Sequence, residues 1–252
     1  MDLGLKGKKA IVTGGTRGIG AAIVDVLLEE GAAVSTCARN AAEVDALNQR
    51  AVAEGLALSA EVCDVADAAA QSDWITRRVT NMGGLDVFIP NVSGGAHAGE
   101  EGWKSAFDVD MMATVRGCEQ VLPIIAQAGG GAIVVIASIS GLEGFSGPSG
   151  YGAIKAGLIS YASQLAEVAA AHNVRVNTVS PGPIHVDDGF WGNVKSQQPE
   201  MYEAVCARHP AGRMGQTREV ANATVFLSSP AASWVAGTNL VVDGAVTRRV
   251  QF

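Results

Sequence analysis

The sequence predicts an α/β domain built on a doubly wound parallel sheet of about seven strands, with helices on both faces. Short apolar runs alternate with longer segments of helical spacing along the whole chain, which is typical of successive right-handed βαβ units. Several runs are apolar at successive positions, as a strand covered on both faces requires. Glycine occupies 31 of 252 positions while proline occupies only 8, which favours tight turns over disorder.

The expected strands are the short runs that read KAIVT, AVSTCA, LALSAEV, LDVFIP, AIVVIAS, VRVNTVS and NLVVD. Each is strand-sized and rich in apolar or β-branched residues. In chain order they are Lys9–Thr13, Ala33–Ala38, Leu56–Val62, Leu85–Pro90, Ala132–Ser138, Val174–Ser180 and Asn239–Asp243.

The expected helices lie between these strands, where apolar residues recur at the spacing of one helix face. Their length exceeds that of the strands, which separates the two kinds of segment. In chain order they are Ile19–Glu30, Ala41–Glu54, Ala66–Met82, Trp103–Ala128, Gly152–His172 and Arg218–Ser228.

Residues 1–252 are expected to form one domain, because we find no internal repeat, low-complexity tract or linker. The stretch 183–210 does not follow the alternation of strands and helices. We expect it to be an inserted loop that contacts the substrate. Long insertions beyond a strand's carboxyl end are where such folds build substrate sites. Its aromatic residues, Phe190, Trp191 and Tyr202, predict a lid over an apolar ligand, and packing anchors are the alternative.

Charge and composition exclude several classes of partner. The formal net charge is −7 and Lys and Arg form no cluster, which argues against nucleic acid. The run 132–137 is strand-sized, and no run approaches a membrane span. The first residues lack the apolar segment of an export signal, so we expect a cytoplasmic protein with reduced thiols. The four cysteines and four histidines are scattered, and no metal site is expected.

A glycine-rich turn follows the first expected strand directly and precedes a helix. It reads Thr13-Gly14-Gly15-Thr16-Arg17-Gly18-Ile19-Gly20. Glycines permit the tight turn and let a pyrophosphate approach backbone N–H groups at the positive helix end. A simple strand–helix connection is the alternative, but the position after the first strand favours nucleotide binding.

Further motifs follow in order along the chain: Cys63-Asp64-Val65, Ser138, Tyr151-Gly152-Ala153-Ile154-Lys155, Asn177-Thr178-Val179-Ser180-Pro181-Gly182 and Val242-Asp243-Gly244. With the glycine turn, which fits the pattern TGxxxGxG, this set resembles the short-chain dehydrogenase/reductase family, including its 3-oxoacyl-carrier-protein reductases. The resemblance implies a Rossmann-type fold, a nicotinamide cofactor and oxidoreductase activity on small molecules.

The resemblance also implies which residues contact the cofactor. Asp64 would accept from the adenine amino group, with a helix N-cap as the alternative role. Ile184 would meet the nicotinamide carboxamide. The full expected set is Gly14, Thr16, Arg17, Gly18, Ile19, Gly20, Arg39, Asp64, Val65, Asn91, Tyr151, Lys155, Pro181, Gly182 and Ile184.

Charge at the end of the second strand indicates which nicotinamide cofactor is used. Sheets that bind NAD place an acid there, whereas those that bind NADP place an arginine nearby. The strand ends in Ala38-Arg39, with no acid, and Arg17 lies in the glycine turn. Two guanidinium groups can hold a 2′-phosphate, which predicts NADP(H). A solvated Arg39 without this role is the alternative.

Tyr151 and Lys155 are four residues apart in a helical segment, so their side chains share one face. A neighbouring ammonium stabilises the phenolate, which lets a tyrosine exchange a proton near neutral pH. With Ser138, thirteen residues upstream, they match the family's Ser–Tyr–Lys set. The resemblance implies that Ser138 polarises the substrate carbonyl, Tyr151 transfers the proton and Lys155 binds the ribose. Ser140 is the local competitor of Ser138.

Three departures from the family pattern stand out. The motif Asn-Asn-Ala-Gly is replaced by Pro90-Asn91-Val92-Ser93, and Pro90 lacks the backbone donor. Val186 stands where the family often supplies a threonine hydroxyl. Asp110 stands where the family has a fourth catalytic residue, a helical asparagine. An exposed helical acid is the alternative for Asp110.

The sequence therefore predicts an NADP(H)-dependent oxidoreductase that interconverts a ketone and a secondary alcohol by direct hydride transfer, with Tyr151 as acid/base. Ser138, Tyr151, Lys155 and Asp110 are the expected catalytic residues. The alternatives are an NADP-binding regulatory protein with little or no turnover, and an elimination or dehalogenation enzyme. The resemblance further implies a homotetramer or dimer joined through the helices at 103–128 and 152–172.

Overall fold

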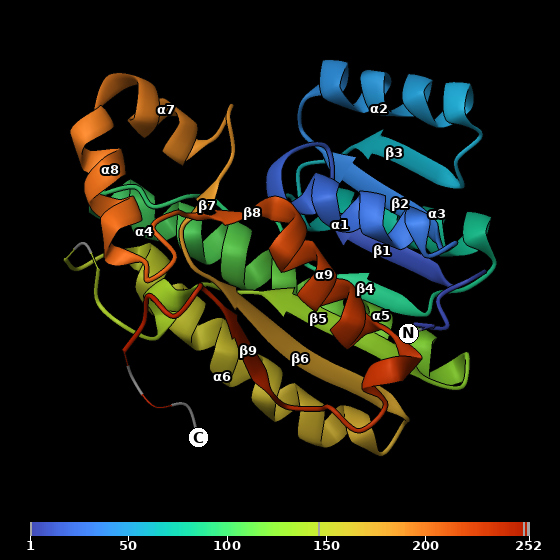
Figure 1. The fold of residues 1–252 in the computed structure, drawn as a ribbon. Helices are drawn as coiled ribbons and strands as arrows, with labels where there is room; N and C mark the ends of the chain where they lie inside the picture. Colours follow the sequence, from blue (N-terminus) through green and yellow to red (C-terminus); the bar gives the residue numbers. More distant parts are fainter. Residues whose placement is uncertain (1, 146, 249, 251–252) are drawn as a thin grey trace.

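The computed structural model describes residues 2–145, 147–248 and 250. Its central layer is a seven-stranded parallel sheet in the order β3-β2-β1-β4-β5-β6-β9 (Figure 1). This confirms the doubly wound, Rossmann-like domain predicted from the alternation. The strands are β1 (Lys9–Thr13), β2 (Ala33–Ala38), β3 (Leu58–Val62), β4 (Val87–Ile89), β5 (Gly131–Ile136), β6 (Val174–Pro181) and β9 (Asn239–Val242), with a separate short pair formed by β7 (Ile184–His185) and β8 (Gly215–Gln216).

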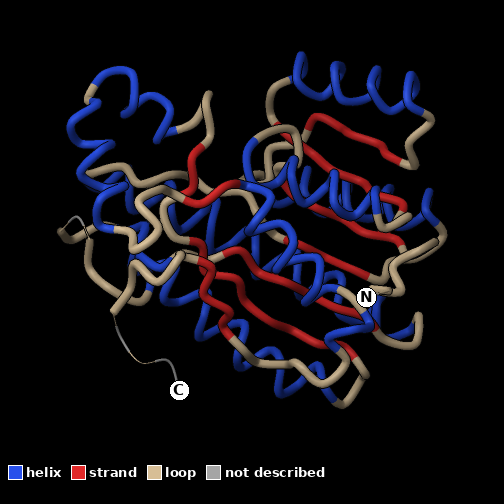
Figure 2. The backbone as a smooth tube through the Cα atoms, viewed as in Figure 1, coloured by secondary structure: helices blue, strands red, loops and turns tan. Residues whose placement is uncertain are grey.

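Helices cover both faces of the sheet, as Figure 2 shows by the helices on either side of the strands. The longest, α6, is 21 residues, and no helix in the described part of the chain has the length and apolarity to cross a membrane. The helices are α1 (Gly18–Glu29), α2 (Ala41–Glu54), α3 (Ala68–Met82), α4 (Gly99–Ser105), α5 (Ala113–Gln127), α6 (Gly150–Ala170), α7 (Phe190–Gln197), α8 (Pro199–Arg208) and α9 (Thr217–Ser228). Short 3₁₀ turns span Ile139–Gly141 and Pro230–Ala232.

The continuous apolar runs arise because successive residues of a strand enter different cores. Val12 and Ile89 join a core with α1 and α9, and Ile11 and Phe88 join a second core with α3, α5 and α6. All four side chains are fully buried. A strand with one solvent-exposed face would not have a continuous apolar run, because every second position would be polar.

The strand order reverses between β1 and β4. From β1 the chain moves outward to β2 and β3, then returns so that β4 pairs with β1, with Val12 opposite Ile89. Connections leaving these two strands diverge, which opens a crevice at their carboxyl ends. The glycine turn leaves β1 at this point.

The prediction of one continuous helix at 103–128 is wrong, because a π-helical segment, Ala106–Met112, separates α4 from α5. Such segments insert a wider turn that redirects side chains and often occur at functional sites. Here it carries Asp110 into the interior, where the carboxylate has two partners.

The stretch 183–210 is more regular than its glycines and proline suggested. It holds β7, α7 and α8, which stand together at one side of the sheet in Figure 1. Pro199 is at the start of α8, where its missing N–H costs no helical hydrogen bond, so it begins a helix and does not break one.

Phe88 provides a test of the core around β4. Phe88→Ala should lower the free energy of unfolding by about 3–5 kcal/mol, because the ring is fully buried and its loss leaves a cavity. Phe190→Ala is the matched control, since 68% of Phe190 is exposed and its loss should cost about 0.5 kcal/mol or less. Urea unfolding of both variants measures the difference, and equal losses would contradict the assignment of Phe88 to the core.

Candidate active site

A cleft of about 670 Å³ lies where β1 and β4 diverge. The glycine turn borders it, together with the ends of β2 and β3, the loop after β4, and the segment from β7 into α7. Eleven of the expected cofactor residues line it: Gly14, Thr16, Arg17, Gly18, Ile19, Gly20, Arg39, Asp64, Val65, Asn91 and Ile184.

Two positions of the glycine turn require glycine. A Cβ atom on Gly20 would lie 2.0 Å from the carbonyl oxygen of Gly14 and 2.6 Å from Nδ2 of Asn91. Gly14 itself has a φ of 71°, which disfavours any other residue. The Asn91 amide fixes the turn by donating to the carbonyls of Thr13 and Gly14, at 3.0 and 3.1 Å.

Helix α1 begins beside this turn without a side-chain cap on its N-terminal N–H groups. Its first residues, Gly18, Ile19 and Gly20, line the cleft. Uncapped N–H groups at the positive end of a helix are suited to a phosphate or diphosphate. The turn and α1 therefore fit the diphosphate of a nicotinamide dinucleotide.

Ser138 and Tyr151 lie on two elements at the carboxyl end of β5. Ser138 follows the strand, is 8% exposed, and its hydroxyl accepts from the N–H of Ser140 at 3.1 Å. Ser149 caps α6 by accepting from the N–H of Gly152 at 3.4 Å, which places Tyr151 in the first turn of that helix.

Lys155 is one helical turn further and is only 2% exposed. Its Nζ lies 5.6 Å from the centroid of the Tyr151 ring, as expected for side chains on one face. Nζ donates to the carbonyl of Ile136 at 3.0 Å, at the end of β5. The ammonium is thereby fixed between α6 and the sheet.

Asp110 is the counter-ion of Lys155. Its Oδ1 lies 2.9 Å from Nζ, and its Oδ2 accepts from the N–H of Gly94 at 2.7 Å. The contact to Nζ is an ion pair and not an aligned hydrogen bond, because among the described residues Oδ1 has no donor in hydrogen-bond geometry. Asp110 is 1% exposed, so the alternative of an exposed helical acid is wrong.

The chain is similar to known proteins over nearly its whole length. A family model described as enoyl-(acyl carrier protein) reductase matches residues 14–247. Isoepoxydon dehydrogenase of Penicillium expansum is 36% identical over 257 residues, covering 100% of this chain and 99% of the relative. The 3-oxoacyl-[acyl-carrier-protein] reductase of Vibrio harveyi is 32% identical over 97% of this chain and 99% of the relative.

A solved structure of L-sorbose reductase from Gluconobacter frateurii, complexed with NADPH and L-sorbose, superimposes with a TM-score of 0.91. It is 28% identical and covers 99% of this chain and 100% of that chain. The chain belongs to the short-chain dehydrogenase/reductase family. Members of this family are oxidoreductases that use NAD(H) or NADP(H).

For a short-chain dehydrogenase/reductase, the loop after β4 is unusual at Pro90, yet hydrogen bonds still join it to the ends of β1 and β5. The carbonyl of Pro90 accepts from the N–H of Ile136 at 3.1 Å, and the N–H of Asn91 donates to the Thr13 hydroxyl at 3.0 Å. Val186 lines the cleft with an apolar side chain. The missing N–H at Pro90 is offset by these bonds on either side.

Some expected site residues lie elsewhere. Tyr202 does not border the cleft: its hydroxyl lies 3.2 Å from Nδ1 of His185, and the two rings pack edge to face at 5.4 Å. Phe190 and Trp191 do border it and pack on each other at 5.0 Å. The remaining expected residues, Asp110, Ser138, Tyr151, Lys155, Pro181 and Gly182, are not part of the cleft's lining.

Sequence reasoning also missed several residues that line the cleft, among them Cys37, Cys63, Glu43 and Asn193. Glu43 had a signal, because an acid three residues after Asn40 fits a capping pattern. Asp64 does not cap α3: Asp67 does, by accepting from Ala69 and Ala70 at 2.9 and 3.0 Å. No three His, Cys, Asp or Glu side chains in the described residues are grouped to hold a metal ion.

The ion pair gives a stability prediction for Asp110. Asp110→Ala should lower the free energy of unfolding by about 3–5 kcal/mol, because it leaves the buried Lys155 ammonium without its counter-ion and the Gly94 N–H without its acceptor. Asp110→Asn should cost less, since an amide oxygen can still accept from Gly94.

Asp108→Ala is the matched control, because Asp108 lies on the same π-helical segment and is exposed. Its free energy of unfolding should stay within about 0.5 kcal/mol of wild type. Urea unfolding curves in which Asp110→Ala matches this control would show that the pair adds nothing to stability.

Proposed function

We propose that this short-chain dehydrogenase/reductase is an NADP(H)-dependent oxidoreductase that interconverts a ketone and a secondary alcohol by direct hydride transfer. The observation that carries the proposal is the joint position of Tyr151 and Lys155 on one face of α6, with Lys155 fixed by Asp110 and the sheet, beside a cleft whose glycine turn fits a dinucleotide. The NADPH in the L-sorbose reductase structure, at a TM-score of 0.91, supports it further.

A nicotinamide bound in this cleft would supply the hydride for reduction of the substrate carbon, or accept it in oxidation. Ser138 donates a hydrogen bond to the carbonyl oxygen and orients it. The Tyr151 hydroxyl gives the same oxygen a proton in reduction and takes it back in oxidation. The Lys155 ammonium stabilises the phenolate left on Tyr151, and it also binds the nicotinamide ribose.

Asp110 is assigned a supporting role in the same reaction. Its carboxylate and the carbonyl of Ile136 together fix the direction in which Nζ of Lys155 projects. A lysine held on two sides loses little further freedom when a ribose binds, which favours productive geometry.

The remaining cofactor contacts are assigned from the family resemblance, and most of these residues line the cleft. The N–H groups of Gly18, Ile19 and Gly20 would hold the diphosphate, Asp64 would bind the adenine amino group and Ile184 would contact the carboxamide. Pro181 ends β6 and Gly182 follows it, two residues before Ile184, so both would contact the nicotinamide side, while Val65 and Asn91 would contact the adenosine. Arg17 and Arg39 line the same cleft and hold the 2′-phosphate.

The substrate is a small carbonyl compound received under α7. Phe190 and Trp191 border the cleft from this helix and cover it with apolar surface. Turnover distinguishes this enzyme from a regulatory protein that only binds NADP, and the retention of Ser138, Tyr151 and Lys155 favours the enzyme. The experiment that tests for turnover measures NADPH consumption with β-keto thioesters, cyclic diketones, aryl ketones, steroid ketones and a ketohexose.

Cofactor preference is the first prediction of the proposal. NADPH should exceed NADH by about 10–100-fold in kcat/KM, because a charge-assisted hydrogen bond to the 2′-phosphate contributes roughly 1.5–3 kcal/mol. Ala38→Asp combined with Arg39→Ala should reverse the preference by adding an acid for the ribose hydroxyls and removing a guanidinium. Equal or better use of NADH by the wild type in steady-state assays would contradict the assignment.

Proton transfer by Tyr151 is the second prediction. Tyr151→Phe should lower kcat by about 10²–10⁴-fold while NADPH still binds, as measured by fluorescence titration. Tyr161→Phe is the matched control, because Tyr161 lies on the same helix and its buried hydroxyl has no hydrogen-bond partner in the described structure. Retention of more than about a tenth of kcat by Tyr151→Phe would assign proton transfer to another group.

A further inference from the structure

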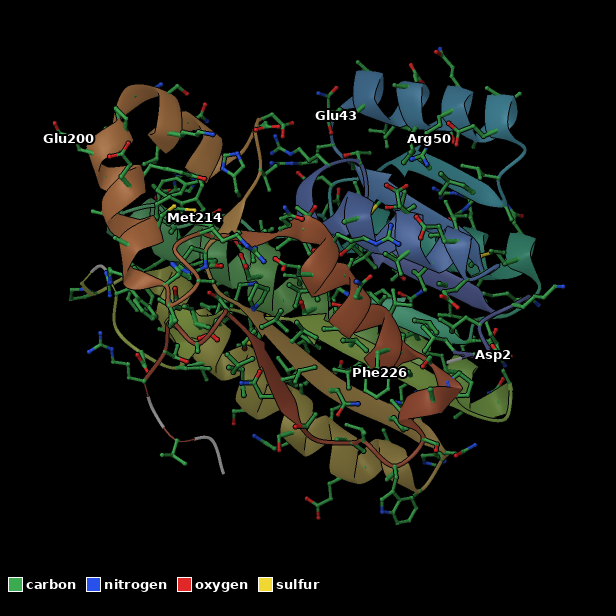
Figure 3. The ribbon with its side chains drawn as sticks, viewed as in Figure 1. Asp2, Glu43, Arg50, Glu200, Met214 and Phe226 are labelled. Atoms are coloured by element: carbon green, nitrogen blue, oxygen red, sulfur yellow. The ribbon has the colours of Figure 1, made fainter. Side chains whose placement is uncertain are left out.

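A carboxylate lines the cleft near its two arginines. Glu43 lies in the first turn of α2, at the end of that helix nearest to α7 in Figure 3. Its Oε2 accepts from the Thr16 hydroxyl at 2.6 Å, and its Oε1 accepts from the Asn40 amide at 3.1 Å. These bonds fix the acid against the glycine turn.

Glu43 forms no ion pair with the described residues. Arg17 and Arg39 line the same cleft, yet in the described part of the chain neither guanidinium comes within ion-pair distance of Glu43 or any other acid. Thr16 and Asn40, which do contact Glu43, are neutral. Among the described residues, no cation lies within ion-pair distance of this carboxylate, which shares the cleft's lining with Arg17 and Arg39.

We infer that Glu43 is a specificity-determining residue that limits the preference of this cleft for a 2′-phosphorylated adenosine. A 2′-phosphate brings about two negative charges toward Arg17 and Arg39, and Glu43 repels them, whereas a 2′-hydroxyl is neutral and can donate to a carboxylate. The inference rests on the proposed function, because it takes this end of the cleft as the adenosine ribose site.

The size of the effect follows from Coulomb's law near a protein surface. Like charges several ångströms apart in partly screened surroundings change an affinity by about 3–10-fold. The effect of Glu43 should shrink as ionic strength rises, since the cleft is open to solvent.

A purely structural role for Glu43 makes a different prediction. An acid at the third position of a helix also supports the helix start, and glutamine can replace it in that role. Glu43→Gln therefore preserves the shape and the acceptor for Thr16 while removing the charge. A structural role would alter the binding of both nucleotides equally, or lower stability alone.

The test measures nucleotide binding without turnover. Isothermal titration gives the Kd of adenosine 2′,5′-bisphosphate and of 5′-AMP for wild type, Glu43→Gln, Glu43→Ala and Asp45→Asn. Asp45 is the matched control, because it is an exposed acid on the same helix outside the lining of the cleft. We expect the ratio of the AMP Kd to the bisphosphate Kd to rise about 3–10-fold in both Glu43 variants and to stay within twofold in Asp45→Asn.

The same variants are assayed for kcat/KM with NADPH and NADH, where the NADPH preference should rise by a similar factor. An unchanged Kd ratio in folded Glu43→Gln or Glu43→Ala, or an equal rise in Asp45→Asn, overturns the inference. The wild-type values test the proposed function separately. A wild type that favours 5′-AMP and NADH contradicts the NADP assignment, while the shift in the Glu43 variants still decides the role of Glu43.

Discussion

The buried pair of Asp110 and Lys155 is the constraint around which the site is organised. Removing two charges from water is costly, and the cost is offset only where each group finds a partner and further hydrogen bonds. Lys155 adds the carbonyl of Ile136 and Asp110 adds the N–H of Gly94. One ion pair thus connects α6, the end of β5, the π-helical segment and the loop after β4, so these four segments hold a common position.

Two local irregularities lie next to this pair. A regular helix through 106–112 would carry its side chains on a different angular course, and the π-helical turn brings Asp110 inward. The loop after β4 begins with Pro90, which has no N–H to donate, and it is attached by the bonds of Asn91 and Gly94 on its far side. Both segments depart from regular structure where the ion pair and the glycine turn hold them.

The cleft is electrically asymmetric. Outside its lining, Asp110 and Lys155 form a buried ion pair whose opposite charges balance, with Lys155 Nζ 5.6 Å from the centroid of the Tyr151 ring. The lining itself presents two exposed arginines with Glu43 fixed beside them by Thr16 and Asn40. The buried pair is shielded from solvent, whereas the charges that line the open cleft are screened by water and salt.

The sequence alone determined the seven strands of the main sheet, the glycine turn and the shared face of Tyr151 and Lys155. Each depends on residues close in the chain: apolar runs, a cluster of glycines and a spacing of four. Only the tertiary structure decided the partners of Asp110 and Glu43, the place of Tyr202 and the π-helical segment. Lys155 and Asp110 are 45 positions apart in sequence, and Glu43 and Thr16 are 27. Contacts across such separations form only when the sheet brings distant segments together, and no local pattern encodes them.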